Sequence, residues 1–245
     1  MDYAKYKYIL VERIGKILRL TLNRPERLNA IIPEMHTEIT GLFGDIRQDH
    51  DADLIIITGA GRGFCAGADL SRPFPDDRAG IDKVFTEARE ILLNILEIDK
   101  PIISAVNGPA AGLGVTLALF ADIVIASDRA KLGDTHVKVG VVAGDGGAVI
   151  WPLLVGVNKA KEMLMTGQVI EAQEALRIGL VNHVVPHEEL DKTVMDMAKQ
   201  LLDGHKMAIQ GTKKAVNLYI KWMLNQVFDY SLTLERQCVR NIYSK

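Results

Sequence analysis

The sequence predicts an α/β fold whose C-terminal part is helical. Two observations lead to this fold class. Strand-like segments alternate with amphipathic helical segments through the first two thirds of the chain, and the pattern is helical throughout from Glu188 onward. Alternating strands and helices are typical of a largely parallel sheet covered by helices. We therefore expect an α/β core over residues 1–190 and a helical region over residues 191–245.

The first half of the chain contains three expected strands and two expected helices. In order, they are a strand over 16–22, a helix over 33–46, a strand over 54–58, a helix over 81–98 and a strand that begins at Pro101. The first strand alternates in polarity and ends at a turn, and the second is a continuous apolar run. The helix over 33–46 places Met35, Ile39, Leu42 and Ile46 on one face, which predicts that this face is buried.

The second half repeats the alternation with shorter elements. In order, they are a helix over 115–120, a strand over 122–126, helices over 158–166 and 171–177, and a strand over 181–185. Gly179 closes the second of the two adjacent helices. These elements complete the predicted α/β core.

Composition excludes several classes of protein. The 245 residues are 48% hydrophobic and carry a formal net charge of -2 with both signs mixed, which disfavours nucleic-acid binding. Cys65 and Cys238 form no disulfide framework, and the polar N-terminus does not resemble a signal peptide. The most apolar window, 110–126, contains Asp122 and falls short of a membrane span. We expect a cytoplasmic protein without a nucleic-acid or membrane partner, and without a metal or redox cofactor.

Two glycine-rich turns are the most informative segments. Residues 61–70 (GRGFCAGADL) follow the strand over 54–58, and residues 107–114 (NGPAAGLG) follow the strand that begins at Pro101. Small residues at a strand exit let the backbone approach a ligand, and a helix start leaves N–H groups without partners. Two such turns side by side can direct two donors at one oxygen, which is the requirement for an oxyanion hole.

These segments resemble the crotonase family, also called the enoyl-CoA hydratase/isomerase superfamily. The matching pieces are 23–30 (NRPERLNA), 64–70 (FCAGADL), 100–114, 121–123 (ADI), 165–167 (MTG) and 175–181 (ALRIGLV). The resemblance implies a spiral of ββα units and C-terminal helices that build a homo-trimer or a dimer of trimers. It also implies a carbonyl substrate, usually an acyl-CoA, so that coenzyme A enters only as part of the substrate.

The resemblance assigns roles to individual residues. It places the oxyanion donors at the backbone N–H groups of Ala68 and Leu113. It places the substrate along the two turns and the helix that follows, with two arginines near its phosphates. The implied substrate-binding residues are Arg24, Arg27, Ala66, Asp69, Leu70, Gly112, Thr116 and Trp151.

The chain departs from the family at the two glutamates that hydratases use. Thr116 and His136 occupy those positions, so the usual two-carboxylate hydration lacks its residues. His136 is followed nine positions later by Asp145, and a carboxylate can orient a histidine base. This pair, with Trp151 after it and Glu235 near the end, resembles the β-diketone (oxocamphor) hydrolase branch of the superfamily. That branch has a histidine where this chain has Leu113.

The expected function is therefore an enzyme that stabilises an enolate or oxyanion. His136, Asp145 and Glu235 are the candidate catalytic residues, and the preferred reaction is retro-Claisen hydrolysis of a carbon–carbon bond in a β-dicarbonyl compound. An atypical enoyl-CoA hydratase or isomerase is the first alternative, and a non-catalytic acyl-CoA-binding homologue is the second. The sequence leaves open whether the substrate carries coenzyme A.

Overall fold

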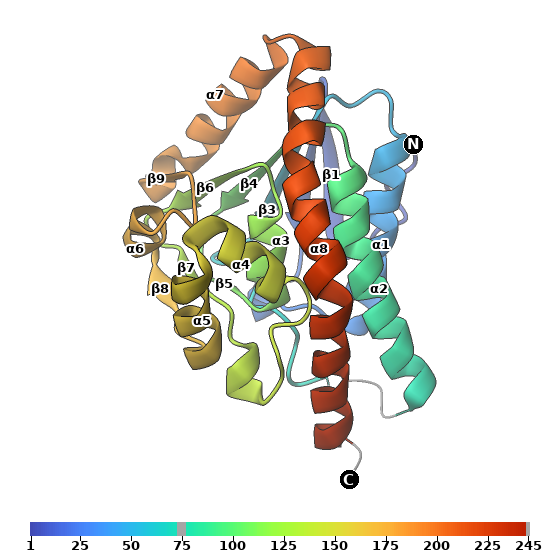
Figure 1. Cartoon of the computed structure of the whole chain (residues 1–245). Helices are drawn as coiled ribbons and strands as arrows, with labels where there is room; N and C mark the ends of the chain where they lie inside the picture. Colours follow the sequence, from blue (N-terminus) through green and yellow to red (C-terminus); the bar gives the residue numbers. More distant parts are fainter. Residues whose placement is uncertain (73–76, 244–245) are drawn as a thin grey trace.

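Strands and helices alternate along the chain as the sequence predicts (Figure 1). The computed structural model describes residues 1–72 and 77–243. Its main sheet runs in the order β1-β2-β3-β4-β6-β9, with β1 antiparallel to β2 and every later pair parallel. The strands are β1 (Ile9–Ile14), β2 (Ile17–Leu22), β3 (Leu54–Gly59), β4 (Ile102–Val106), β6 (Ile123–Ser127) and β9 (His183–Val185). The α/β class is confirmed.

The middle strands are buried on both faces of this sheet. Along β3, Ile55 and Ile57 join the large hydrophobic core on one face. Leu54 and Ile56 pack on the other face with helix α7 (Leu190–Leu202). A strand buried on both faces has a continuous apolar sequence rather than an alternating one, which explains why 54–58 is apolar throughout.

Three long helices cover the face opposite α7. Helices α1 (Pro33–Gln48) and α2 (Arg78–Glu97) pack together, and α8 (Lys206–Tyr243) runs alongside α2 (Figure 1). The buried face expected for α1 is confirmed, since its four predicted apolar side chains are at most 1% exposed. None of the described helices has both the length and the apolar character that a membrane span requires.

Shorter elements lie on the other side of α8 from α2. The helices here are α3 (Leu113–Leu119), α4 (Gly147–Val155), α5 (Val157–Thr166) and α6 (Ala172–Arg177). A small sheet accompanies them, formed by β5 (Ala110–Ala111), β7 (Lys131–Gly133) and β8 (Ile170–Glu171). Three 3-10 turns complete the chain: η1 (Pro25–Arg27), η2 (His136–Val139) and η3 (His187–Glu189).

Two substantial elements have no counterpart among the expected ones. Strand β1 (ILVERI) lies at the edge of the sheet, and only Ile9 in it is buried, so its apolar residues do not alternate with polar ones as in a half-buried strand. Helix α4 begins at a glycine and contains Pro152, both of which disfavour a helix by propensity. Its buried apolar residues, Val149 and Ile150 among them, stabilise it through packing instead.

Candidate active site

The two glycine-rich turns lie directly against each other. Gly67 has a φ of +81°, and a Cβ atom there would lie 2.8 Å from the carbonyl oxygen of Ala111. A Cβ on Gly114 would lie 2.3 Å from the carbonyl oxygen of Cys65. Only glycine permits such an approach of two backbones. The turns after β3 and β4 therefore form one surface, as the sequence predicts.

Buried asparagine amides hold the first turn in place. The Asn29 side chain donates to the carbonyl oxygens of Gly63 at 2.8 Å and Phe64 at 3.1 Å. The Asn107 side chain donates to the carbonyl oxygens of Gly59 and Gly61, each at 2.9 Å. Because each amide bridges several carbonyl groups, the path of this turn is fixed before any ligand binds.

The backbone N–H groups of Ala68 and Leu113 are free to bind a ligand. Neither donates a hydrogen bond to another residue in the described part of the chain, and both residues line the same cavity. Leu113 is the first residue of α3, where a helix leaves its N–H groups unpaired. Two unpaired donors on one cavity can stabilise the oxygen of an enolate.

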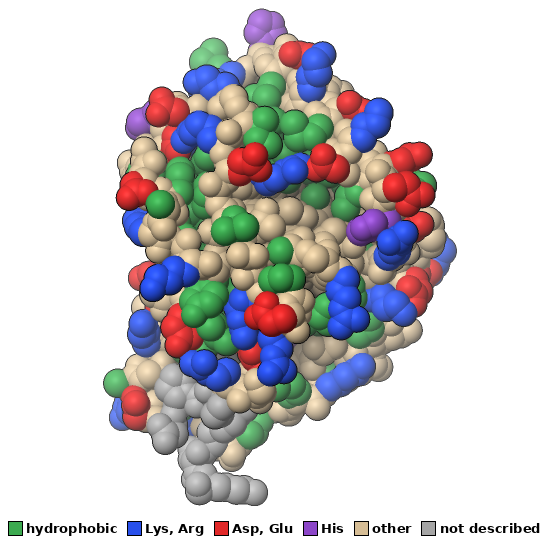
Figure 2. Space-filling model, turned by 180° about the vertical axis from the view of Figure 1, so that it is seen from behind, with side chains coloured by type: hydrophobic (Ala, Val, Ile, Leu, Met, Phe, Trp, Pro, Cys, Tyr) green, Lys and Arg blue, Asp and Glu red, His purple; other side chains and the backbone are tan. Residues whose placement is uncertain are grey.

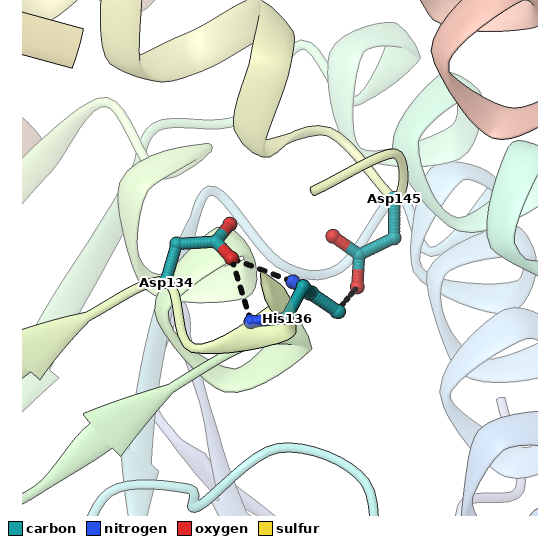
Figure 3. Close-up of side chains that lie close together, drawn as sticks. All are labelled: Asp134, His136 and Asp145. Atoms are coloured by element: carbon teal, nitrogen blue, oxygen red, sulfur yellow. Dashed lines mark hydrogen bonds and ion pairs between the residues drawn. The ribbon is translucent and has the colours of Figure 1, made fainter. Parts of the chain in front are cut away.

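His136 lies between two aspartates (Figure 3). Its Nδ1 lies 2.6 Å from Oδ1 of Asp134, which also accepts the His136 backbone N–H at 3.3 Å. Its Nε2 lies 3.2 Å from Oδ2 of Asp145. The residues come from the segment after β7, the start of η2 and the loop before α4. Both ring nitrogens are therefore engaged by carboxylates.

The two aspartates change the protonation of the histidine. Burial favours the neutral ring, but the negative charges of Asp145 and Asp134 outweigh it and raise the pKa of His136 well above its ordinary value. The ring is therefore an imidazolium at neutral pH that donates to both neighbours. Gly112 lies against it, since a Cβ on Gly112 would be 3.5 Å from Cε1 of His136. The positive charge thus lies next to the oxyanion turn.

Glu235 brings a carboxyl group with a raised pKa to the same cavity. It comes from α8, is 5% exposed, and its Oε2 has no hydrogen-bond partner among the described residues. Burial, followed by the negative charge of Asp145, raises the pKa of Glu235 well above its ordinary value. A carboxyl group that stays neutral at neutral pH can act as a proton donor.

One cavity of about 110 Å³ joins these groups. The α1–α2 pair supplies one wall, and Leu113, His136 and Asp145 supply the other. Figure 1 shows α8 between α2 and α4, and its last turns contribute Glu235 and Ile242 to the cavity. Much of the remaining lining is apolar: Ile31, Ile32, Pro33, Val84, Phe85 and Ala88. The cavity suits a compact apolar substrate with a few oxygen atoms.

The structure separates the predicted substrate-binding residues into two groups. Asp69 and Leu70 line the cavity, although the Asp69 carboxylate already accepts from Ser71 at 2.6 Å and from Arg24 at 3.1 Å. The Arg24 side chain is 14% exposed and also donates to the Ala30 carbonyl, so its guanidinium is occupied within the fold. Arg27 is exposed on η1.

Two other predicted contacts lie behind the cavity surface, and a third, Ala66, is half-buried and does not line the cavity. Thr116 is fully buried, and its hydroxyl donates to Oδ1 of Asp145 at 3.3 Å, so it reaches the cavity only through that carboxylate. Trp151 is fully buried in the core and does not line the cavity. Thr116 and Trp151 therefore support the site from within the fold. The Ala66 N–H donates to the Leu28 carbonyl at 3.0 Å, so this N–H is occupied.

The histidine cluster favours proton sharing over metal binding. Donor atoms of Asp134, His136 and Asp145 all lie within 4.8 Å of one another. However, the two carboxylates contact different nitrogens of the ring, at hydrogen-bond distances. A metal ion requires ligand atoms that converge on one point. The absence of a resident metal stays a prediction.

Two site residues have no role in the sequence analysis. Asp134 lies two positions before His136 in a loop, and no periodic pattern marks it. His36 is buried, at 6% exposure, and its Nδ1 lies 2.8 Å from Oε2 of Glu87 on α2. A signal existed, since His36, Thr40 and Phe43 follow the 3.6-residue period of a second buried stripe on α1.

Comparisons with known proteins agree with this geometry. A family model described as enoyl-CoA hydratase/isomerase matches residues 12–242. The short-chain-enoyl-CoA hydratase of Clostridium acetobutylicum is 37% identical over 210 residues, covering 85% of this chain and 80% of the relative. An enoyl-CoA hydratase/isomerase structure from Mycobacterium paratuberculosis has a TM-score of 0.93 at 35% identity, covering 99% of each chain. A β-diketone hydrolase from the cyanobacterium Anabaena, bound to (S)-3-oxocyclohexyl acetic acid, has a TM-score of 0.91 at 29% identity, covering 98% and 97%.

Proposed function

The chain belongs to the enoyl-CoA hydratase/isomerase family, and from this premise we propose that it hydrolyses a carbon–carbon bond of a β-dicarbonyl compound. One observation carries the proposal. An aspartate–imidazolium–aspartate cluster and a protonated Glu235 share a small cavity with two unused backbone donors. Water activation, proton donation and enolate stabilisation are the three tasks of a retro-Claisen hydrolysis.

The reaction begins with the addition of water. The Asp145 carboxylate, held by His136, accepts one proton as the water oxygen attacks a carbonyl carbon of the substrate. When the tetrahedral intermediate collapses, the bond to the central carbon breaks and its electron pair forms an enolate on the second carbonyl group. The N–H groups of Ala68 and Leu113 bind the enolate oxygen, each contributing about 3 kcal/mol to the barrier reduction.

Glu235 completes the reaction by protonating the enolate carbon. Its raised pKa favours the protonated carboxyl group, and it lines the cavity. The proton that Asp145 took from water then returns to Glu235, whose pKa the negative charge of Asp145 raises. One water molecule is consumed, its hydroxyl joins the attacked carbon, and the product is a keto acid.

Atypical hydration or isomerisation of an enoyl-CoA is the second candidate. The hydratase name of a 37% identical relative favours it. Asp145 and Glu235 would then take the places of the two family glutamates, adding the hydroxyl and the proton of water across a double bond. A third candidate is a non-catalytic acyl-CoA binder, for which turnover would be absent and thioester binding would survive His136→Ala.

Assembly and partners follow the family in this proposal. Leu218, Tyr219 and Trp222 on α8 are 64%, 73% and 65% exposed, which supports a homo-trimer or dimer of trimers that covers them. On the face in Figure 2, Lys and Arg side chains lie among Asp and Glu side chains, which agrees with a small-molecule partner rather than a nucleic acid. We propose a cytoplasmic enzyme without a cofactor of its own.

Turnover of two substrates tests the proposal. The protein is incubated with 2,2-dimethylcyclohexane-1,3-dione and, separately, with crotonyl-CoA, and products are followed by mass spectrometry. We expect ring opening of the dione that His136→Ala and Asp145→Asn both abolish. Turnover of crotonyl-CoA alone would refute the hydrolase and support the hydratase. Turnover of neither, with thioester binding, would support the binder.

A further inference from the structure

A retro-Claisen hydrolysis develops negative charge on two oxygens, and the glycine turns serve one of them. The enolate oxygen is bound by the backbone donors of Ala68 and Leu113. The attacked carbonyl first becomes a tetrahedral alkoxide and then a carboxylate, so it needs a donor of its own. The inference below rests on the proposed function because it concerns this second oxygen.

Most polar groups in the cavity are already engaged. His136 uses both ring nitrogens, and the Asp69 carboxylate is bonded to Arg24 and Ser71. Arg72, at the cavity, pairs with Glu34 at 3.0 Å. In the proposed reaction, the proton of Glu235 is transferred to the enolate carbon and so does not bind the second oxygen.

His36 is different because only one of its ring nitrogens is bonded. Its Nδ1 faces Glu87, and its Nε2 has no partner among the described residues. Nε2 of His36 is not one of the fully enclosed side-chain atoms that lack a hydrogen-bond partner. Part of its surface is therefore accessible. Since His36 is only 6% exposed and lines the cavity, this surface is turned toward the cavity.

Glu87 orients the ring of His36. The carboxylate is buried between His36, Thr37 and Lys83, with Oε1 accepting from the Thr37 hydroxyl at 2.7 Å and lying 3.5 Å from the Lys83 ammonium. Although burial opposes ionisation, the contacts with His36 and Thr37 lower the pKa of Glu87. An ionised partner that accepts from Nδ1–H fixes the ring orientation and leaves Nε2 directed at the cavity.

The geometry points to His36 as the second oxygen-binding group of the cavity: with one proton on Nδ1 shared with Glu87 and a second proton on Nε2, the ring donates from Nε2 to the oxygen of the attacked carbonyl and later to the product carboxylate. His36 lies on the wall formed by α1 and α2, whereas His136 and Asp145 lie on the other wall. The substrate class that fits carries two oxygen functions on a compact apolar framework. A ligand with one carbonyl group occupies only one of two anchors, which are the backbone N–H pair of Ala68 and Leu113 and the Nε2 of His36.

Two amide substitutions separate the nitrogens of His36. The amide of His36→Asn reaches the position of Nδ1 and keeps the bond to Glu87, but leaves nothing at Nε2. The amide of His36→Gln reaches the position of Nε2 and keeps a donor in the cavity. Both are made in an Asp145→Asn background, which stops turnover so that binding is measured alone.

The readout is the affinity for a matched pair of ligands, measured by calorimetry. The pair is 2,2-dimethylcyclohexane-1,3-dione and 2,2-dimethylcyclohexanone, which differ by one carbonyl group. We expect the parent and His36→Gln to bind the dione about tenfold more tightly than the ketone, as one hydrogen bond predicts. We expect His36→Asn to bind both equally, with its thermal stability retained.

Several outcomes would overturn the inference. They are equal affinity of the parent for the two ligands, preference for the dione in His36→Asn, and loss of that preference in both variants. The measurement is also independent of the proposed reaction. If the native protein fails to cleave the dione yet the variants show the expected pattern, the second anchor stands and the proposed hydrolysis fails.

Discussion

Oδ1 of Asp134 lies 2.6 Å from Nδ1 of His136, and the aspartate is 1% exposed. A buried carboxylate at this distance orients the ring and holds a proton on Nδ1, so that Nε2 faces Asp145. The second oxygen of Asp134, Oδ2, has no hydrogen-bond partner among the described residues. Within this part of the chain, the hydrogen bonds of the carboxylate are those of Oδ1, and both are with His136. Asp134 therefore acts on the reaction through His136 rather than by contact with substrate.

Replacing Asp134 with asparagine removes that charge while keeping the shape. We predict that kcat falls by about 10²-fold, since the oriented imidazolium is weakened. Asp134 raises the pKa of His136, so the limb of the pH–rate profile on which the imidazolium is lost should move to lower pH. A profile measured from pH 6 to 10 checks this.

A matched control exists elsewhere in the fold. Oδ1 of Asp128 accepts the backbone N–H of His187 at 3.1 Å, away from the cavity. Asp128→Asn should leave the profile in place. An alkaline limb that stays fixed in Asp134→Asn would contradict the role of Asp134.

Removing the acid of Glu235 should affect turnover more than binding. Glu235→Gln retains the volume but cannot give a proton to the enolate carbon, and we predict a loss of about 10²-fold in kcat with little change in KM. Steady-state kinetics on the dione measure both constants. A KM that rises while kcat holds would instead make Glu235 a binding group.

The same substitution should stabilise the protein at neutral and alkaline pH. The folded-state pKa of Glu235 is raised, so the wild-type protein loses stability as pH rises from the unfolded value of about 4.3 toward the folded value. The loss is at most about 1.4 kcal/mol per pH unit, and glutamine avoids it. Chemical unfolding at pH 5 and pH 8 should give a larger advantage for Glu235→Gln at pH 8. Glu90→Gln, at an exposed site on α2, is the control and should give the same difference at both pH values.

Gly67 tests the contact between the two turns. Gly67→Ala would bring a Cβ atom to 2.8 Å from the Ala111 carbonyl oxygen, forcing apart the backbone that carries Ala68 and Leu113. We predict a fall in kcat of about 10²-fold or more, comparable to the loss of one oxyanion donor. Gly15→Ala shares the positive φ, at +59°, but meets no atom within 4 Å, so it reports backbone strain alone. Equal losses of activity in both variants would count against the oxyanion role.

The sequence predicts the fold well wherever burial imposes a recognisable pattern of apolar residues. The apolar run of β3 and the stripe of α1 follow directly from burial on two faces and on one face. It fails for β1, whose pairing with β2 comes from backbone hydrogen bonds, and for α4, where packing overrides glycine and proline.

The site is predictable in its backbone part and only partly in its side chains. Glycines reveal the two turns because close approach permits no other residue. The contact between His36 and Glu87 joins positions 51 residues apart, and no local pattern encodes such a pair. Asp134 is close to His136 in sequence, but its role depends on a loop conformation that orients both side chains.

Hydrolysis of the dione in ¹⁸O-labelled water tests the central claim most directly. If water attacks a carbonyl carbon and the carbon–carbon bond breaks, the ring-opened keto acid acquires one labelled oxygen, located in its carboxylate by fragmentation mass spectrometry. We predict this product from the native protein and none from Asp145→Asn. An intact dione, with label entering a hydroxyacyl-CoA formed from crotonyl-CoA, would contradict the hydrolase and identify a hydratase.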